Sequence, residues 1–160
     1  MSDWLPDGKL PDVATKHGSF LFLVGTILNQ NISGELAWKG VARLSERVSL
    51  APEQLVACPL DELTDKIRQA PSIHPFATAM ARAIHAAADR VCEQYDGDAR
   101  SLWRQTASAD HVATRLIQFR QIGQHKADVA VFLLTTVYGE LDTAPEGVEH
   151  ACPSLLAYLN

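Results

Sequence analysis

The residues most suggestive of chemistry lie in one window towards the C-terminal end of the chain. Between Asp110 and Asp128 the sequence has no acidic residue, although the whole chain has a formal net charge of −5. Gly123 interrupts two apolar helical patterns there, and the backbone N–H groups that begin a helix can bind phosphate. The window also contains several basic or titratable side chains: His111, Arg115, Arg120, His125 and Lys126. This arrangement could hold a nucleic-acid backbone beside the Lys126 amine.

Lys126 is a candidate nucleophile. An amine can attack the C1′ carbon of a sugar and form a Schiff base, but only when it is deprotonated. Its pKa therefore has to fall, and we expect the helix N-terminus and the nearby Arg120 and His125 to lower it. The alternative is a solvated lysine that contacts phosphate or nothing.

A second candidate is a run of three amides, Asn29-Gln30-Asn31, which ends a strongly apolar segment. Burying an amide without a hydrogen-bond partner costs about 1–3 kcal/mol, so such a run needs an explanation. One explanation is capping, because Asn often ends a helix and Ser33 can begin the next one. The other is a polar wall that faces a ligand or a DNA strand.

Helical spacing of apolar residues extends through most of the chain, and no segment shows sustained alternation of period two. We expect Ser19, Ser33 and Ser108 to cap helices, and Gly123 to supply a positive φ in the turn between the last two helices. Helices are expected over 20–30, 34–48, 51–57, 59–69, 76–95 and 102–106, followed by a helical hairpin over about 109–138. The sequence therefore predicts an all-α fold with a single domain over 1–160.

Composition narrows the class of protein. The chain has 160 residues, 47% of them hydrophobic, which is enough for one domain with a core. Its three cysteines are scattered and lack metal-ligand spacing, so we expect neither a disulfide framework nor a metal site. No apolar run could span a membrane and residues 1–17 do not read as a signal peptide, so we expect a cytoplasmic protein. The negative charge argues weakly against strong non-specific DNA binding but permits a local basic face.

The remaining histidines and tryptophans are assigned structural places. We interpret His74, His85, His111 and His150 as surface or capped side chains, and Trp38 and Trp103 as core anchors.

Both candidate stretches resemble motifs of the helix-hairpin-helix DNA glycosylase superfamily (HhH-GPD, endonuclease III-like). The family's turn usually reads Leu-Pro-Gly-Val/Ile-Gly-x-Lys-Thr/Ala-Ala, and residues 119–127 here read FRQIGQHKA. Gly123 matches, and Lys126 is taken as the motif's lysine, although it stands one residue later than that position, which His125 occupies; Arg120 and Gln121 replace the proline and the first glycine. The segment TILNQNIS at 26–33 resembles the family's TILSQNT segment. The resemblance covers about 16–143.

The resemblance implies a helical glycosylase fold, compact or C-terminally shortened, and a set of site residues. By this match Lys126 is the Schiff-base nucleophile, and Asp142, in Leu141-Asp142-Thr143, is the assisting carboxylate, with Glu140 as its substitute. Gln30 would enter the DNA stack beside a flipped nucleotide. The DNA-binding residues expected from the two motifs are Gln30, Asn31, Arg120, Gln121, Gly123, Gln124 and His125.

The resemblance also implies a partner and bears on cofactors. The expected partner is double-stranded DNA with a damaged base or an abasic site, bound by a monomer that would associate with the nucleoid in a bacterium or archaeon. Many relatives carry a four-cysteine iron–sulfur loop, but this chain lacks the cysteines, so no cluster is expected. A monovalent cation could bind the hairpin through the backbone oxygens of Phe119, Gln121 or Ile122.

The implied function is a DNA glycosylase of base excision repair, with abasic-site lyase activity as an option. Two alternatives stay open. One is a catalytically inactive or weak DNA-binding relative, favoured by the altered turn at Arg120 and Gln121 and by the acidic total charge. The other is a helical protein-interaction module on the same fold.

Overall fold

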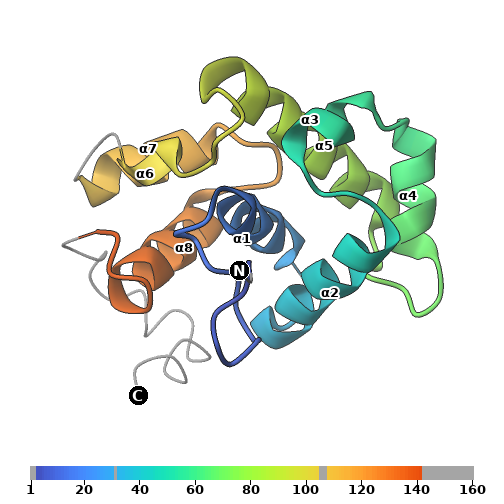
Figure 1. Cartoon of the computed structure of the whole chain (residues 1–160), viewed down its shortest axis with the longest axis horizontal. Coiled ribbons are helices and arrows are strands. Elements are labelled where there is room, and N and C mark those ends of the chain that lie inside the picture. The colour runs from blue at the N-terminus through green and yellow to red at the C-terminus, as the bar shows by residue number, and fades with distance from the viewer. Residues whose placement is uncertain (1–2, 31, 105–107, 142–160) are drawn as a thin grey trace. The chain divides into compact units, whose positions relative to one another are not determined.

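The computed structural model describes residues 3–30, 32–104 and 108–141, and these residues fold into α-helices without a strand (Figure 1). An isolated bridge joins Trp4 and Pro11. The helices are α1 (Lys16–Leu28), α2 (Gly34–Arg47), α3 (Pro52–Ala57), α4 (Leu60–Arg68), α5 (Ala77–Gln94), α6 (Ser101–Arg104), α7 (Ala109–Ile117) and α8 (Gln124–Thr136). The predicted all-α class is confirmed.

The chain divides into two compact units, Met1–Arg100 and Ser101–Asn160. The sequence predicts a single domain over 1–160, and that stays a prediction. None of the helices in the described ranges is both long enough and apolar enough to cross a membrane.

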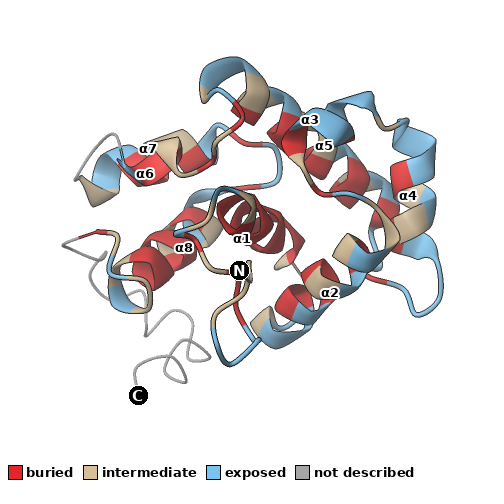
Figure 2. Cartoon of the chain, in the orientation of Figure 1, coloured by how far each residue is buried: buried red, intermediate tan, exposed pale blue. Residues whose placement is uncertain are grey.

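Helix α1 is the core of the first unit, and Figure 2 shows it buried along almost its whole length. It packs against α2 and α5. Thr15, not Ser19, is its N-cap, because the Thr15 hydroxyl accepts from the Gly18 N–H at 2.9 Å. Ser19 lies inside the helix and donates to the Lys16 carbonyl at 2.6 Å. The sequence misplaced the cap because the apolar run begins at Phe20, one turn after the helix itself.

Helix α2 crosses α1 at a glycine. A Cβ on Gly25 would overlap the Trp38 ring, so the absence of a side chain there allows the close approach. Trp38 also stacks on Phe22, with ring centroids 5.7 Å apart and an interplanar angle of 15°. The prediction that Trp38 anchors the core is confirmed. Ser33 caps α2 as predicted, by accepting from the Leu36 N–H at 3.2 Å.

Arg47, at the end of α2, connects this helix to the segment that follows α4. Its guanidinium donates to the carbonyls of Lys66 at 2.9 Å, Gln69 at 3.0 Å and Pro71 at 2.9 Å. Carbonyls at the end of a helix have no partner within it, and Arg47 satisfies them. The segment enters α5 after a cis Ala70–Pro71 bond, and α3 and α4 both pack on α5.

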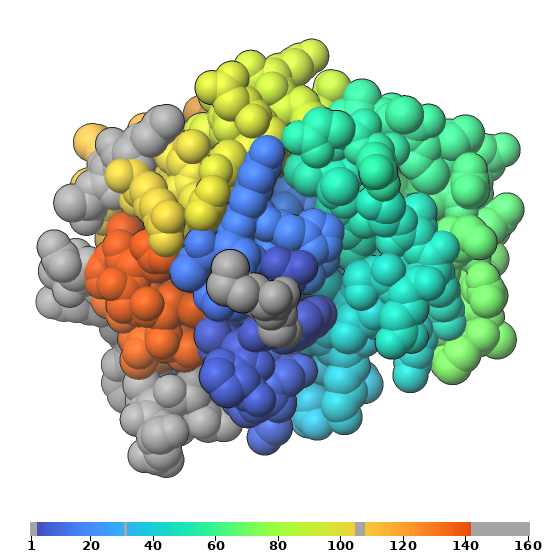
Figure 3. Space-filling model, viewed as in Figure 1, coloured from blue at the N-terminus to red at the C-terminus, as the bar shows by residue number. Residues whose placement is uncertain are grey.

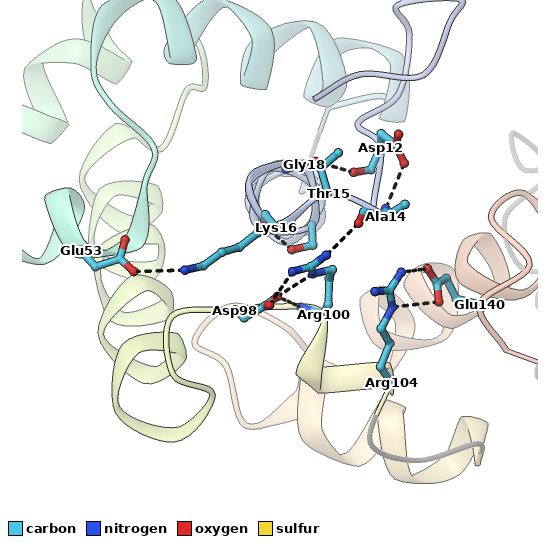
Figure 4. Close-up of polar contacts among 11 residues, drawn as sticks. Asp12, Ala14, Thr15, Lys16, Gly18, Glu53, Asp98, Arg100, Arg104 and Glu140 are labelled. Carbon is cyan, nitrogen blue, oxygen red and sulfur yellow. Dashed lines mark hydrogen bonds and ion pairs between the residues drawn. The ribbon is translucent and has the colours of Figure 1, made fainter. Parts of the chain in front are cut away.

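A polar network closes the N-terminus of α1 (Figure 4). Arg100 forms a two-point ion pair with Asp98, at 2.9 and 2.8 Å, and donates to the Ala14 carbonyl at 2.9 Å. The Arg100 side-chain hydrogen bonds hold the pKa of Asp98 below its usual value. The N-terminal arm, in the darkest blue on the surface in Figure 3, joins through Asp3, which accepts from the Thr15 hydroxyl at 3.1 Å.

The second unit contains α6, α7 and α8. Ser108 caps α7 as predicted, accepting from the His111 N–H at 3.4 Å. Arg115 donates to the carbonyls of Ser101 and Leu102, at 3.3 and 3.1 Å, and so fixes α7 to α6. Trp103 is 1% exposed, which confirms its predicted place in the core.

Candidate nucleic-acid interface

The turn between α7 and α8 is tight and anchored at both ends. The Ile122 N–H donates to the Phe119 carbonyl at 3.2 Å, and both of these side chains are buried. Gln121 is in the left-handed region with φ 70°, whereas Gly123 has φ −93° and ψ −172°. The prediction that Gly123 supplies the positive φ is therefore wrong. Gln121, which stands where the resembled motif has its first glycine, adopts that conformation despite its Cβ.

Gly123 is the N-cap of α8, and it leaves the helix end open. Its carbonyl accepts from the Ala127 N–H at 3.0 Å, and no side chain caps the helix. A Cβ at this position would meet no atom within 4 Å, and the first helical residues, Gln124 and His125, are exposed. An open helix N-terminus carries a partial positive charge and N–H donors, which suits an anion.

Lys126 lies in the first turn of α8 and is half-buried. Burial lowers the pKa of Lys126 from its ordinary value of 10.5 to about 8. The direction agrees with the sequence-based expectation, but the cause differs, because desolvation and not the charge of Arg120 or His125 produces the shift. The chain therefore lowers the pKa of this amine before any DNA covers it.

The remaining hairpin side chains present a smaller cationic surface than the sequence suggests. Arg120, Gln121 and His125 are exposed, as DNA-binding residues should be. Arg115 is not available to a ligand in the same way, because it supports the α6 backbone. The Gln124 side chain donates to the Asp128 carboxylate at 2.7 Å, so its amide already has a partner within the helix.

The structure describes one of the two candidate carboxylates, Glu140, but not the other, Asp142. Asp142 lies outside the described residues. Glu140, its substitute, forms an ion pair with Arg104, with NH2 to Oε1 at 3.0 Å and Nε to Oε2 at 3.4 Å. Its backbone N–H also donates to the Leu134 carbonyl at 2.8 Å. Glu140 therefore serves to hold the end of α8, and Arg104 offsets its charge.

Gln30 belongs to the first unit and follows α1, whereas Lys126 and the other hairpin residues belong to the second. The Gln30 N–H donates to the Leu28 carbonyl at 2.7 Å, and the Gln30 carbonyl lies 2.8 Å from Nε2 of His74. Asn31 lies outside the described residues.

His74 is the residue of this region that sequence reasoning missed. It is 2% exposed, so of the two interpretations, a surface or a capped side chain, only the second fits, since both ring nitrogens have hydrogen-bond partners. Its Nδ1 accepts from the Phe76 N–H at 3.0 Å, beside the N-terminus of α5. The available signal was the dipeptide His74-Pro75 before a helix whose N-cap, Phe76, has no capping side chain.

Two solved structures are similar to the chain. One is a non-covalent complex of endonuclease III with DNA, 25% identical, with a TM-score of 0.58, and the match covers 83% of this chain and 54% of that one. The other is a trapped covalent intermediate of endonuclease III with DNA, an estranged-adenine complex, 24% identical, with a TM-score of 0.53 and coverage of 71% and 46%. The chain has an endonuclease III-like fold. The fold expected from the two sequence motifs is thereby confirmed.

The match covers only part of the endonuclease III chains. The chain spans about half the length of the endonuclease III chains that it matches, 54% and 46%. No protein-family model and no curated protein matches it.

The cysteines of this endonuclease III-like chain do not suit a four-thiolate cluster, because the sequence has only three. In the described part of the chain, no group of three or more His, Cys, Asp or Glu side chains could hold a metal ion. Burial, followed by Glu62 and Asp61, raises the pKa of the Cys58 thiol, and burial, followed by Glu53, raises that of Cys92. A monovalent cation at the hairpin carbonyls stays a prediction.

Proposed function

We propose that the protein is a DNA glycosylase with abasic-site lyase activity, and that Lys126 is its nucleophile. One observation carries this proposal: burial lowers the pKa of Lys126 to about 8, in the first turn behind an uncapped helix N-terminus. The endonuclease III-like fold supports the same reading, since endonuclease III itself has been trapped as a covalent intermediate with DNA.

The lowered pKa makes the amine usable at neutral pH. With a pKa of about 8, roughly one Lys126 in ten is neutral at pH 7, whereas an ordinary lysine is neutral in fewer than about one in a thousand molecules. Bound phosphates favour the charged amine and work against this shift. The amine therefore has to stay desolvated when DNA is bound.

The proposed reaction balances as follows. Neutral Nζ attacks C1′ of the damaged nucleotide, and the bond between the sugar and the base breaks as the N–C bond forms. The base leaves with the bonding electrons and takes up a proton, and the amine proton passes to a carboxylate, for which Asp142 is the sequence-based candidate. Opening of the sugar ring gives an imine, and loss of a C2′ proton then breaks the C3′–O bond.

The hairpin would hold the DNA backbone for this reaction. A Cβ at Gly123 would meet no atom within 4 Å, so a phosphate there could accept from the N–H groups of Gln124 and His125 and lie near the exposed Arg120 side chain. Gln30 would fill the gap that a nucleotide leaves when it rotates out of the stack. This filling matters because unstacking and unpairing a base costs a few kcal/mol.

Borohydride trapping on an abasic duplex tests the proposal. The wild-type protein should give a covalent adduct that Lys126→Ala abolishes, while DNA affinity stays within about threefold. Lys9→Ala is the matched control, because Lys9 is exposed and has no place in the proposed DNA site, and it should trap normally. Asp142→Asn should slow trapping without removing it. An adduct undiminished in Lys126→Ala would assign the chemistry to another amine.

A DNA-binding relative without turnover is the second candidate. It is favoured by Gln121, a residue with a Cβ at φ 70° in a turn where the resembled motif has glycine, and by the net charge of −5. Tight binding of the abasic duplex with no adduct from the wild type would support it. Absence of any DNA binding would instead support the protein-interaction module.

A further inference from the structure

His74 has both ring nitrogens committed, and this assigns its tautomer. The Gln30 carbonyl can only accept, so Nε2, at 2.8 Å from it, must carry the proton. The Phe76 N–H can only donate, so Nδ1, at 3.0 Å, must be bare. The two contacts together specify the neutral ring with its proton on Nε2.

The ring is held in a fixed place. It is 2% exposed and lies against the Phe76 ring, with centroids 5.7 Å apart and an interplanar angle of 49°. The Ser72 hydroxyl donates to the His74 carbonyl at 3.2 Å, and the Ile73 N–H donates to the Ile67 carbonyl at 2.8 Å. Because the neighbouring Ile73 backbone is bonded to α4 and the His74 ring accepts from Phe76, the N-cap of α5, His74 can act as a fixed point for a neighbouring segment.

The segment that His74 holds is the one that carries Gln30, 44 residues earlier in the chain. A peptide unit is planar, so fixing the Gln30 carbonyl fixes the plane that follows its Cα. The direction of the Gln30 side chain is set from the same Cα. A hydrogen bond to this carbonyl therefore restricts where the side chain can point.

Residues of the Gln30 and His74 segments line a cleft. Ile32, Ile73 and His74 help to line a cleft of about 370 Å³, whose wall also includes Lys39 and Arg43 of α2. Leu36, on the same wall, is 56% exposed. Ile32, two residues after Gln30, and His74 thus both lie at a surface that a ligand can reach, next to the Arg43 side chain.

We propose that His74 is a positioning residue, which holds the Gln30 backbone so that the Gln30 side chain can enter a disturbed DNA stack. The inference rests on the proposed function for the role of Gln30. It adds that the histidine acts through its Nε2–H donor and not through its contribution to the stability of the fold.

Two substitutions separate these contributions, because each keeps one of the two hydrogen bonds. In His74→Gln the side-chain amide reaches as far as Nε2 and can still donate to the Gln30 carbonyl. In His74→Asn the amide oxygen lies where Nδ1 was and can still accept from Phe76, but it cannot reach Gln30. Each variant loses one bond, so their melting temperatures should fall by similar amounts.

The DNA readout is the ratio of affinities for an abasic duplex and the intact duplex. His74→Gln should keep this ratio within about threefold of the wild type, and His74→Asn should lower it about tenfold, towards the value of Gln30→Ala. Amide hydrogen exchange of a peptide spanning 28–34, measured without DNA, should speed up in His74→Asn and not in His74→Gln.

Failure of this inference can be told from failure of the proposed function. If both variants exchange alike and lose the ratio in proportion to their melting temperatures, His74 is only structural and the inference is overturned. If the exchange difference is present but wild-type protein does not prefer abasic DNA, the proposed function fails and His74 positions Gln30 for some other ligand.

Discussion

Helices α1 and α8 begin with the same kinds of residue, but a side chain caps the N-terminus of α1 and none caps that of α8. Each has 13 residues, a mostly buried body, no acid in its first turn, and one lysine and one histidine there. At α1 the Thr15 hydroxyl caps the helix, and the arm carrying Asp3 and Asp12 closes over it. At α8 the N-cap is Gly123, with no capping side chain and open space beside it.

The two helix ends differ in whether a side chain of the protein accepts a hydrogen bond from the first backbone N–H groups. The first N–H groups of any helix need acceptors from outside the helix. At α1 the Thr15 hydroxyl supplies one for the Gly18 N–H, so this end serves the fold. At α8 no side chain of the described residues caps the helix, so this end is suited to bind an anion.

Adding one methyl group at each of these ends should give opposite results. A Cβ on Gly18 would overlap the Asp12 carbonyl oxygen and lie 2.8 Å from that of Asp3. Gly18→Ala should therefore cost about 3 kcal/mol or more, because backbone cannot move aside as a flexible side chain can. Gly123→Ala should stay within about 0.5 kcal/mol. Thermal unfolding followed by circular dichroism measures both, and equal losses would remove the contrast between the two ends.

Closing α8 with an acid should separate stability from binding. Gly123→Asp provides a capping carboxylate, so stability should rise by a few tenths of a kcal/mol. The same carboxylate would occupy the place of a phosphate and repel it, lowering DNA affinity by about tenfold or more. Gel-shift titration at two salt concentrations gives the affinity and its salt dependence. Unchanged affinity would mean that the hairpin does not contact the DNA.

The two lysines should differ in their effect on folding. Lys126 is half-buried with a pKa of about 8, whereas the Lys16 side chain is 53% exposed and lies 3.9 Å from Glu53. Lys126→Met should stabilise the protein at pH 7 by about 1 kcal/mol after allowance for solvent screening, and Lys16→Met should change little. Denaturant titrations of both variants provide the comparison.

The pH dependence of the Lys126→Met effect follows from the direction of the shift. The folded-state pKa, about 8, lies below the unfolded value, so the unfolded chain binds more protons between the two. The cost of burying the charged amine is complete below pH 8 and disappears as the pH rises towards about 10.5. The advantage of Lys126→Met should shrink over that interval, and a constant advantage would mean that it comes from packing.

The smallest expected effect concerns the turn that presents α8. Gln121 has φ 70°, so Gln121→Gly should stabilise by about 0.5–1 kcal/mol. Gln118, whose φ is −71°, serves as the control, and Gln118→Gly should destabilise by a similar amount. The midpoint of urea unfolding should rise for Gln121→Gly and fall for Gln118→Gly. DNA binding by Gln121→Gly should be no weaker than that of the wild type.

Local signals predicted the fold well. Helical periodicity located the helices to within a few residues, and Ser33 and Ser108 were recognised as caps because a serine acts on the N–H three residues later. Ser19 was chosen wrongly because the apolar pattern starts later than α1 does. Of the site, the sequence identified the hairpin turn and Lys126, whose role stays a prediction, together with those of the other site residues.

Contacts between distant parts of the chain were beyond local reasoning. Nothing near Lys126 in the sequence indicates that it is buried, so its pKa shift was attributed to neighbouring charges. The sequence could not decide whether His74 is a surface or a capped residue, because its partner, Gln30, is 44 residues away. Arg115 was counted as part of a cationic surface, although its targets are carbonyls 13 and 14 residues earlier. Sequence pattern gives the face of a helix but not the atom that a long side chain reaches.

Arg47 has a consequence for how the first unit opens. Its three acceptors lie 19, 22 and 24 residues further along the chain, so one guanidinium closes a loop that contains α3 and α4. Releasing any part of that loop breaks several charge-assisted bonds at once, which discourages fraying one residue at a time. Residues 52–71 should therefore exchange their amides and admit proteases as a single cooperative block.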